Sequence, residues 1–422
     1  MRIVAILGVL LVAACGATGG AAASRPSPSA HATPTPVATA LETPTAVASA
    51  SSEPASAPRT EPPQPSPTPP MPAVQCAAGV VPTSQAVVYG ASQWILYDVT
   101  NPMQPRVVCR AANTSVHIVT GTSFEYLQPR VDGNTDVVLH ALGSNNETVV
   151  ATFRADLSGL YFSAWTPIAW SPSLSAMAYS AQGGTDANGL GITDVWLATA
   201  SGRTKVYSYA VPGIDSFRRP GIPAPALSIS ADGAYLAAGW AIAVGSIRVF
   251  RLSDMANVTP ALPKDFRSVL WAKTGHRLFM VGTSSVAEWT PGSAVTTLPN
   301  TTGWVLDPNF SPDGTQVAFT GVSTTGQIGA NLYDLNTSSS HVLSSQPRSS
   351  TIFVKAGWVW YLEEKPCVAS ANDPCFDPTA PDGKVFAVEL RTRAESAVTF
   401  ASGESPIQPG NFGYMLHGDL WP

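Results

Sequence analysis

The sequence predicts an all-β fold in which one hairpin recurs along the chain. The sharpest copy lies at residues 308–321, where Ser311-Pro312-Asp313-Gly314 separates two apolar runs. Proline presets φ for a turn, aspartate bonds its own backbone, and glycine accepts a positive φ, so this motif predicts strand, tight turn, strand. From residue 76 onward, tryptophan, tyrosine, valine and isoleucine become common, which is the composition of strands.

Related hairpins set the length of the repeat. They lie at Ile168–Ser180, Leu227–Gly239 and Val269–Val281. Together with the 308–321 copy, their aligned turn positions are 171, 230, 272 and 311, which gives spacings of 59, 42 and 39 residues. A period near 40 with one long insertion is in the range of β-propeller blades.

A second hairpin follows each copy of the first, and two hairpins per repeat make a four-stranded blade. Seven second hairpins are predicted, at 93–109, 148–163, 193–209, 246–262, 286–298, 330–343 and 384–400. We therefore expect a single propeller of seven blades; six or eight remain open, because the repeats near 120–145 and 350–362 are degraded. The strand-like C-terminus at 411–421 has no blade of its own, so we expect it to complete blade 1 and close the ring.

These repeats resemble the TolB-like and WD-like β-propeller repeats of bacterial envelope proteins. The resemblance covers residues 76–422, and the Gly-His and Trp-Asp signatures of true WD repeats are missing, which favours the TolB-like kind. It implies the fold and leaves the function open, because propellers serve as enzymes, scaffolds and receptors. The stretches that carry it are Phe310–Gly314 with Val317–Phe319, Ser230–Gly233 and Trp170–Pro172.

The first residues of the sequence are expected to be an export signal. Arg2 precedes an apolar run at residues 3–12, which is too short to span a bilayer. Val12-Ala13-Ala14-Cys15 resembles the lipobox of bacterial lipoproteins, which implies a signal peptide at residues 1–14 and a lipid on Cys15. The alternative is an ordinary secretory signal with an incidental cysteine. We expect a cell-envelope protein, lipid-anchored on the outer side of the bacterial membrane.

Residues 15–75 are predicted to be a disordered linker before the propeller domain at 76–422. The linker consists almost entirely of alanine, proline, serine and threonine, so it has little to bury that would offset the entropy of ordering. Dense proline favours an extended chain of about 3.1 Å per residue, and the linker therefore reaches on the order of 100 Å. We interpret it as a spacer between the anchor and the propeller.

The five cysteines fit this organisation. An odd number in an exported chain suggests one cysteine with another role, which Cys15 would have if it carries the lipid. The remaining four are Cys76, Cys109, Cys367 and Cys375, and an oxidising compartment favours disulfides between them. The sequence-local pairing is Cys76–Cys109 and Cys367–Cys375, although three connectivities remain open. No Cys-x-x-Cys motif is present, and no metal site is expected.

The order of the hairpins predicts which face of the propeller carries the long loops. In antiparallel blades with strands A to D, the A–B and C–D turns lie on one face, and the B–C loops and D–A crossovers on the other. The long segments 181–191, 211–226, 322–329 and 363–383 all fall in B–C or D–A positions, and loops gathered on one face typically mark a binding surface. The candidate ligand-binding residues on this loop-rich face are Asp186, Arg218, Arg219, Glu363, Glu364, Asp373 and Asp377.

No known catalytic motif is found. The net charge of −5 gives no reason to expect nucleic acid, and Gly-x-Ser-x-Gly, His-Glu-x-x-His and dinucleotide-binding patterns are missing. We therefore assign no catalytic residues and no cofactor. We expect a monomeric, non-catalytic module that binds an envelope protein, peptide or glycan. The alternatives are a propeller lyase or glycoside hydrolase with carboxylates at the central channel, and an assembly scaffold of the TolB kind.

Overall fold

The computed structural model divides the chain into two units, Met1–Pro65 and Ser66–Pro422, and every described residue belongs to the second. The predicted signal peptide, Cys15 and the linker up to residue 72 lie outside the described residues. The described ranges are 73–90, 93–144, 146–157, 168–185, 191–210, 226–239, 247–262, 266–282, 285–301, 304–322, 328–363, 384–407 and 417–418.

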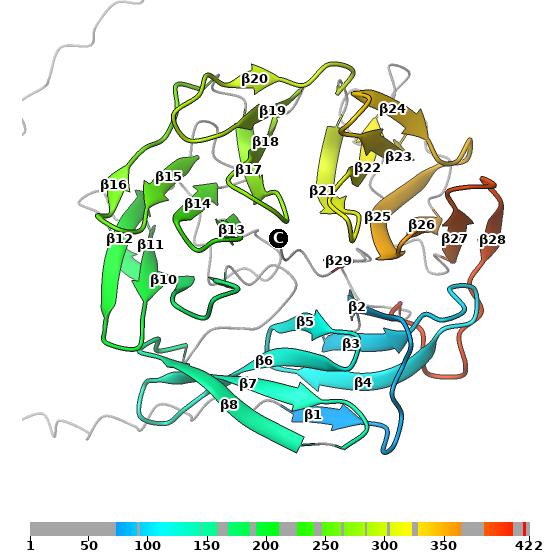
Figure 1. The fold of residues 1–422 in the computed structure, drawn as a ribbon, viewed down its shortest axis with the longest axis horizontal. Coiled ribbons are helices and arrows are strands. Elements are labelled where there is room, and N and C mark those ends of the chain that lie inside the picture. Colours follow the sequence, from blue (N-terminus) through cyan, green and yellow to red (C-terminus); the bar gives the residue numbers. More distant parts are fainter. Residues whose placement is uncertain are drawn as a thin grey trace, which may run out of the picture. The chain divides into compact units, whose positions relative to one another are not determined.

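The strands of these ranges form seven antiparallel sheets, each of which is one blade (Figure 1). Blade 1 contains β29 (His417–Gly418), β2 (Gln85–Gly90), β3 (Gln93–Asp98), β4 (Arg106–Ala112) and β1 (Ala73–Cys76) in spatial order. Blade 2 contains β5 (Val116–Thr120), β6 (Ser123–Pro129), β7 (Thr135–Ala141) and β8 (Asn146–Phe153). Blade 3 contains β9 (Ile168–Trp170), β10 (Met177–Thr185), β11 (Gly191–Ala198) and β12 (Arg203–Ala210).

The other four blades have the same order of four consecutive strands. Blade 4 contains β13 (Ala226–Ile229), β14 (Tyr235–Gly239), β15 (Arg248–Arg251) and β16 (Ala256–Asn257). Blade 5 contains β17 (Phe266–Trp271), β18 (Leu278–Gly282), β19 (Val286–Trp289) and β20 (Thr296–Thr297). Blade 6 contains β21 (Trp304–Phe310), β22 (Gln316–Val322), β23 (Ile328–Asp334) and β24 (Ser339–Val342), and blade 7 contains β25 (Arg348–Lys355), β26 (Trp358–Glu363), β27 (Val385–Glu389) and β28 (Glu395–Ala397).

Both faces of each blade are covered, and this closes the ring. In β3, Ile95 and Tyr97 pack against blade 7, whereas Trp94 and Leu96 pack against blade 2, because alternate side chains of a strand point to opposite faces. Seven apolar clusters of this kind occur among the described residues, one between each pair of neighbouring blades. The predicted all-β fold, a single propeller of seven blades, is therefore confirmed.

The two ends of the described chain meet in blade 1, as the sequence predicted. Strand β29 pairs with β2, so the C-terminal segment supplies the innermost strand of a blade that begins near residue 73. The segment after β28 also crosses to blade 1, where the Thr399 N–H donates to the Met103 carbonyl at 2.9 Å. Strand β1 adds a fifth strand outside β4, an addition that the repeat pattern did not predict.

One hairpin was predicted in the wrong place. The second hairpin of blade 2 was expected at 148–163, but the structure forms it from β7 and β8, which span residues 135–153. Strand β8 is the exposed outer strand of the blade, and most of its side chains face solvent, so its pattern does not distinguish a third strand from a fourth. The other six second hairpins coincide with C–D strand pairs.

The predicted turn chemistry is confirmed in blade 6. Gly314 has φ +69°, and its N–H donates to the Ser311 carbonyl at 2.9 Å. Gly233 has the same place in blade 4, with φ +73°. In blade 3, Leu174 takes this place at φ +54°, a region that residues with a side chain rarely adopt.

The four long segments connect β10 to β11, β12 to β13, β22 to β23 and β26 to β27, so each occupies a B–C or D–A position as predicted. The segment 181–191 is shorter as a loop than expected, because residues 181–185 extend β10 and Gly191 begins β11. Most of their residues lie outside the described ranges. Within the described ranges there is no helix of the length and apolarity needed to cross a membrane.

Candidate functional site

The ligand site predicted on the loop-rich face stays a prediction. Of its residues, Glu363 alone is described: it ends β26, is half-buried, and its N–H donates to the Lys384 carbonyl at 2.8 Å. The others lie outside the described residues, as do two of the cysteines that were expected to pair: Asp186, Arg218, Arg219, Glu364, Asp373, Asp377, Cys367 and Cys375.

The predicted disulfide between Cys76 and Cys109 is present. It joins β1 to β4, where the two cysteines are directly opposite each other in the strand pairing. The imidazole of His140, from β7 of the next blade, lies beside the two sulfur atoms. The bond stabilises the fold by reducing the conformational entropy of the unfolded chain, and this effect increases with the sequence separation of the cysteines, which is 33 residues here.

The opposite face carries a repeated polar arrangement in its A–B turns. In blade 6, the buried Ser311 hydroxyl donates to Asp313 Oδ1 at 2.5 Å and accepts the Gln316 N–H at 2.9 Å. In blade 4, the buried Ser230 hydroxyl donates to Asp232 Oδ1 at 2.7 Å. Each serine therefore closes its turn and fixes an aspartate side chain that is itself exposed.

These hydrogen bonds stabilise the ionised form of both carboxylates. The Ser311 hydroxyl is the largest influence at Asp313 and, together with donors from Thr315, holds the pKa of Asp313 below its ordinary value. At Asp232, partial burial acts to raise the pKa, but the Ser230 hydroxyl, a backbone N–H and the neighbouring His276 together outweigh it and lower the pKa. Both side chains are thus anions at neutral pH.

The A–B turns of neighbouring blades contact one another, and together they form what we call the A–B rim. Asp232 Oδ1 of blade 4 lies 3.2 Å from His276 Nδ1 of blade 5. A Cβ at Gly233 would lie 3.3 Å from Ser173 Oγ of blade 3, and a Cβ at Gly314 would lie 3.7 Å from Lys273 Cβ of blade 5. The rim comprises the turns at residues 171–175, 230–234, 272–276, 311–315 and 356–357 of blades 3 to 7.

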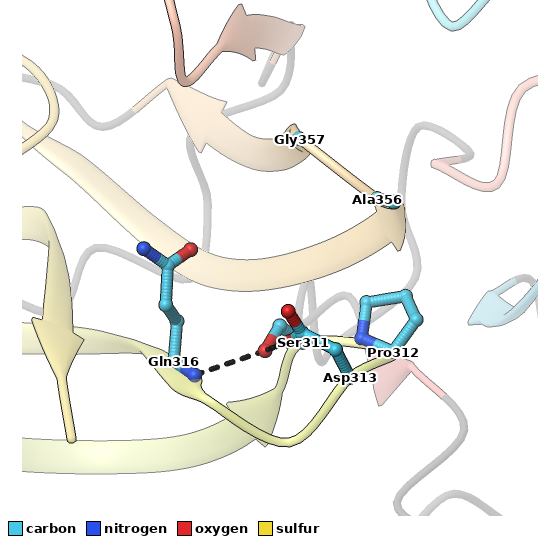
Figure 2. Close-up of a pocket in the computed structure, with 6 residues that line it drawn as sticks. All are labelled: Ser311, Pro312, Asp313, Gln316, Ala356 and Gly357. Atoms are coloured by element: carbon cyan, nitrogen blue, oxygen red, sulfur yellow. Dashed lines mark hydrogen bonds between the residues drawn. The ribbon is translucent and has the colours of Figure 1, made fainter. Parts of the chain in front are cut away.

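A hollow of about 300 Å³ opens on the rim between blades 6 and 7 (Figure 2). One wall is the Ser311–Gln316 turn, and the other is the A–B turn of blade 7. A backbone wall of small residues on one side and a fixed carboxylate on the other suit a cationic or hydroxyl-bearing group. The lining residues are Ser311, Pro312, Asp313, Gln316, Ala356 and Gly357.

Sequence reasoning identified the residues of the rim but interpreted them as structural turns. The serine and aspartate recur at residues 230–233 and 311–314, and this repetition is the sequence feature that indicates a shared polar arrangement. What was not visible is that His276 of one repeat reaches Asp232 of the previous one, because that contact depends on how neighbouring blades are stacked.

Comparison with known proteins concerns the fold. No protein-family model matches the sequence, and no curated protein matches it. Among solved structures, TolB from Acinetobacter baumannii is similar over 77% of this chain and 77% of its own, with 14% identity and a TM-score of 0.38. The β-propeller domain of the Trilobed protease from Pyrococcus furiosus is similar over 67% of this chain and 82% of its own (9% identity, TM-score 0.39). Sqt1 from Saccharomyces cerevisiae is similar over 78% of this chain and 87% of its own (12% identity, TM-score 0.40).

Proposed function

We propose that this chain is a non-catalytic binding module of the bacterial cell envelope, held on the outer side of the membrane by a lipid on Cys15. Residues 15–75 would serve as the spacer that carries the propeller away from its anchor. The observation that supports a binding role is the A–B rim, where a hollow lies beside the fixed carboxylate of Asp313.

The charge state of the rim favours binding over acid–base catalysis. A glycosidase needs a carboxylic acid whose pKa is raised so that it can protonate the leaving group. The carboxyl groups of Asp232 and Asp313 have lowered pKa values instead, and each already accepts a hydroxyl hydrogen bond. Such groups bind cations without exchanging protons at neutral pH.

We infer that the ligand is a protein or peptide segment that places a lysine or arginine side chain in the hollow. A hydrogen bond between a cationic group and a fixed carboxylate is about twice as strong as a neutral one. Because three donors already hold Asp313 Oδ1, the carboxylate need not be ordered when the ligand arrives.

The test compares binding of matched peptides to the full chain and two variants. The peptides are compared in pairs on an array, and the two members of a pair differ at one position, where one has lysine and the other norleucine. Asp313→Asn removes the charge at the hollow but keeps an oxygen that accepts from Ser311. The matched control is Asp132→Asn, which removes another exposed carboxylate with a lowered pKa, on the B–C face.

We expect lysine peptides to bind at least tenfold more weakly to Asp313→Asn, which is about 1.4 kcal/mol, and equally well to Asp132→Asn and the parent. Preference for lysine should weaken as salt is raised. Equal binding by both variants, or no preference for lysine, would refute the rim as the binding surface. Replacing Cys15 by serine should release the chain from membranes without changing peptide affinity.

A further inference from the structure

A second polar cluster lies between blades 1 and 2, away from the rim residues, and the proposed function does not use it. Cys76 and Cys109 are held opposite each other by the β1–β4 pairing, which extends over Ala73 to Cys76. The Ala77 N–H continues this pairing with a bond to the Val108 carbonyl at 2.8 Å. The backbone would therefore keep the two sulfur atoms side by side even without the bond between them.

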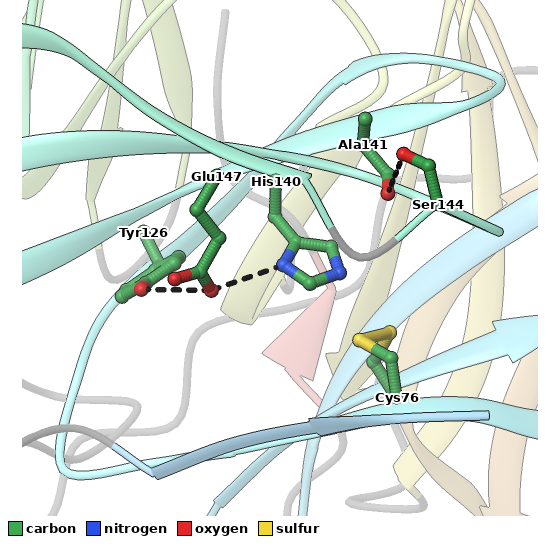
Figure 3. Close-up of a disulfide and its surroundings, with 7 residues drawn as sticks. Cys76, Tyr126, His140, Ala141, Ser144 and Glu147 are labelled. Carbon is green, nitrogen blue, oxygen red and sulfur yellow. Dashed lines mark hydrogen bonds and ion pairs between the residues drawn. A yellow bond between two sulfur atoms is a disulfide. The ribbon is translucent and has the colours of Figure 1, made fainter. Parts of the chain in front are cut away.

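His140 is oriented over these sulfur atoms by a carboxylate (Figure 3). Its Nδ1 lies 3.1 Å from Glu147 Oε1, and the Tyr126 hydroxyl donates to the same oxygen at 3.1 Å. Since a carboxylate accepts, Nδ1 carries the proton and Nε2 presents a lone pair in the neutral imidazole. The ring of Phe124 stacks on the imidazole with centroids 4.9 Å apart and holds its plane.

The Nε2 atom of His140 is buried and has no hydrogen-bond partner. The residue is only 4% exposed, and leaving a buried polar atom without a partner disfavours the folded state. One donor atom of His140 and the sulfur atoms of Cys76 and Cys109 all lie within 4.8 Å of one another. The orphaned nitrogen and the two sulfurs are thus gathered at one point.

We propose that reduction of the Cys76–Cys109 disulfide creates a binding site for a thiophilic cation, Cu(I), with two thiolates and His140 Nε2 as ligands. Thiolate and imidazole are ligands that such soft cations select. With bond lengths like those of zinc, about 2.3 Å to sulfur and 2.0 Å to nitrogen, the donor atoms of such a site lie roughly 3.5–4 Å apart. The three atoms already lie within 4.8 Å of one another, so the sulfurs have to move apart after reduction and the other distances have to change little.

The reaction balances with a dithiol as the reductant. The dithiol gives two electrons and two protons to the sulfur–sulfur bond, forms its own disulfide, and leaves two cysteine thiols. The cation then displaces one proton from each thiol, and His140 contributes its lone pair without losing a proton. Cys76 is partly exposed and Cys109 is fully buried, so the reductant approaches from the side of Cys76.

The number of ligands favours Cu(I) over a structural zinc ion. Zinc in structural sites takes four protein ligands. In the described part of the chain this cluster offers three, because the Glu147 carboxylate is engaged by His140 and Tyr126. A three-coordinate site suits Cu(I). The carboxylate beyond the histidine is the arrangement that orients metal-binding imidazoles and raises their basicity.

The test uses the full chain with Cys15, Cys367 and Cys375 changed to serine, so that the only thiols are those of the proposed site. The protein is reduced with a dithiol, desalted without oxygen, and titrated with Cu(I) against a chromophoric Cu(I) chelator. We expect one tightly bound equivalent in the reduced protein and none in the oxidised protein. X-ray absorption should show two sulfur atoms and one nitrogen around the copper.

Two variants distinguish Cu(I) binding at the proposed site from Cu(I) binding by the two thiols alone. His140→Asn should weaken Cu(I) binding at least tenfold, and Glu147→Gln should weaken it 10- to 100-fold through loss of imidazole orientation. His276→Asn, which changes an exposed histidine on the rim, should have no effect. Equal affinity in His140→Asn, equal binding by the oxidised protein, or loss of near-ultraviolet circular dichroism on reduction would each overturn the proposal.

Discussion

Replacing Glu395 by glutamine should destabilise the propeller by about 2–3 kcal/mol, because it leaves the charge of Arg348 without its partner. Arg348 is almost completely buried at the interface between blades 6 and 7, and two of its guanidinium nitrogens donate to Glu395 Oε1. Its guanidinium carbon lies 4.3 Å from the centre of the Phe386 ring, so an apolar surface replaces water around the charge.

The magnitude follows from the exposure of the two partners. Removing one member of a fully buried ion pair costs about 3–5 kcal/mol. Glu395 is 24% exposed in its side chain, and solvent therefore screens part of the charge that remains, which lowers the expected cost. Arg348→Met should cost less than Glu395→Gln, since Glu395 keeps its bond from the Ser344 hydroxyl at 2.8 Å and reaches water.

The assay is a double-mutant cycle on the full chain, with urea unfolding followed by tryptophan fluorescence. We expect the double variant to be more stable than the sum of the two single effects predicts, by about 1–2 kcal/mol, because neither charge is then left alone.

The pair lowers the pKa of Glu395 against the opposing effect of burial. A lowered carboxyl pKa contributes stability above the ordinary pKa that is lost as pH falls, so Glu395→Gln should reduce acid sensitivity. Additive effects, or single losses below 0.5 kcal/mol, would refute this reasoning.

Three further predictions concern the disulfide, a turn and a surface pair. Replacing both Cys76 and Cys109 by serine should lower the free energy of unfolding in urea by about 4 kcal/mol, because the unfolded chain gains the entropy of a 33-residue loop. A decrease of less than about 1 kcal/mol would contradict this prediction. Gly314→Ala should cost about 1–2 kcal/mol because φ is +69°, and an unchanged urea midpoint would show that the turn relaxes. The hydrogen bond from the Arg251 guanidinium, together with one from the Ala256 N–H, lowers the pKa of Asp254 to about 2, so its carboxyl carbon should titrate by NMR near pH 2. In Arg251→Gln it should titrate at a higher pH that is still below its ordinary pKa, because the bond from Ala256 remains.

The architecture could be predicted from the sequence because it depends on interactions between residues that are close together in the chain. A turn such as Ser311–Gly314 depends on the φ preferences and side-chain bonds of four neighbouring residues, and its repetition gives the blade period. The same local logic placed the closing strand at the C-terminus. It failed in blade 2, where the exposed strand β8 lacks an apolar pattern that would mark its position.

Apart from the second hairpin of blade 2 and the added strand β1, the sequence by itself determined the strands, their order in each blade and the face on which the turns lie, since these follow from short-range patterns and antiparallel pairing. The tertiary structure alone decided which side chains of different repeats meet. Asp232 contacts His276, and His140 reaches the Cys76–Cys109 sulfurs, because neighbouring blades stack with a particular rotation about the ring. No short-range pattern contains that rotation, and both candidate sites of this protein depend on it.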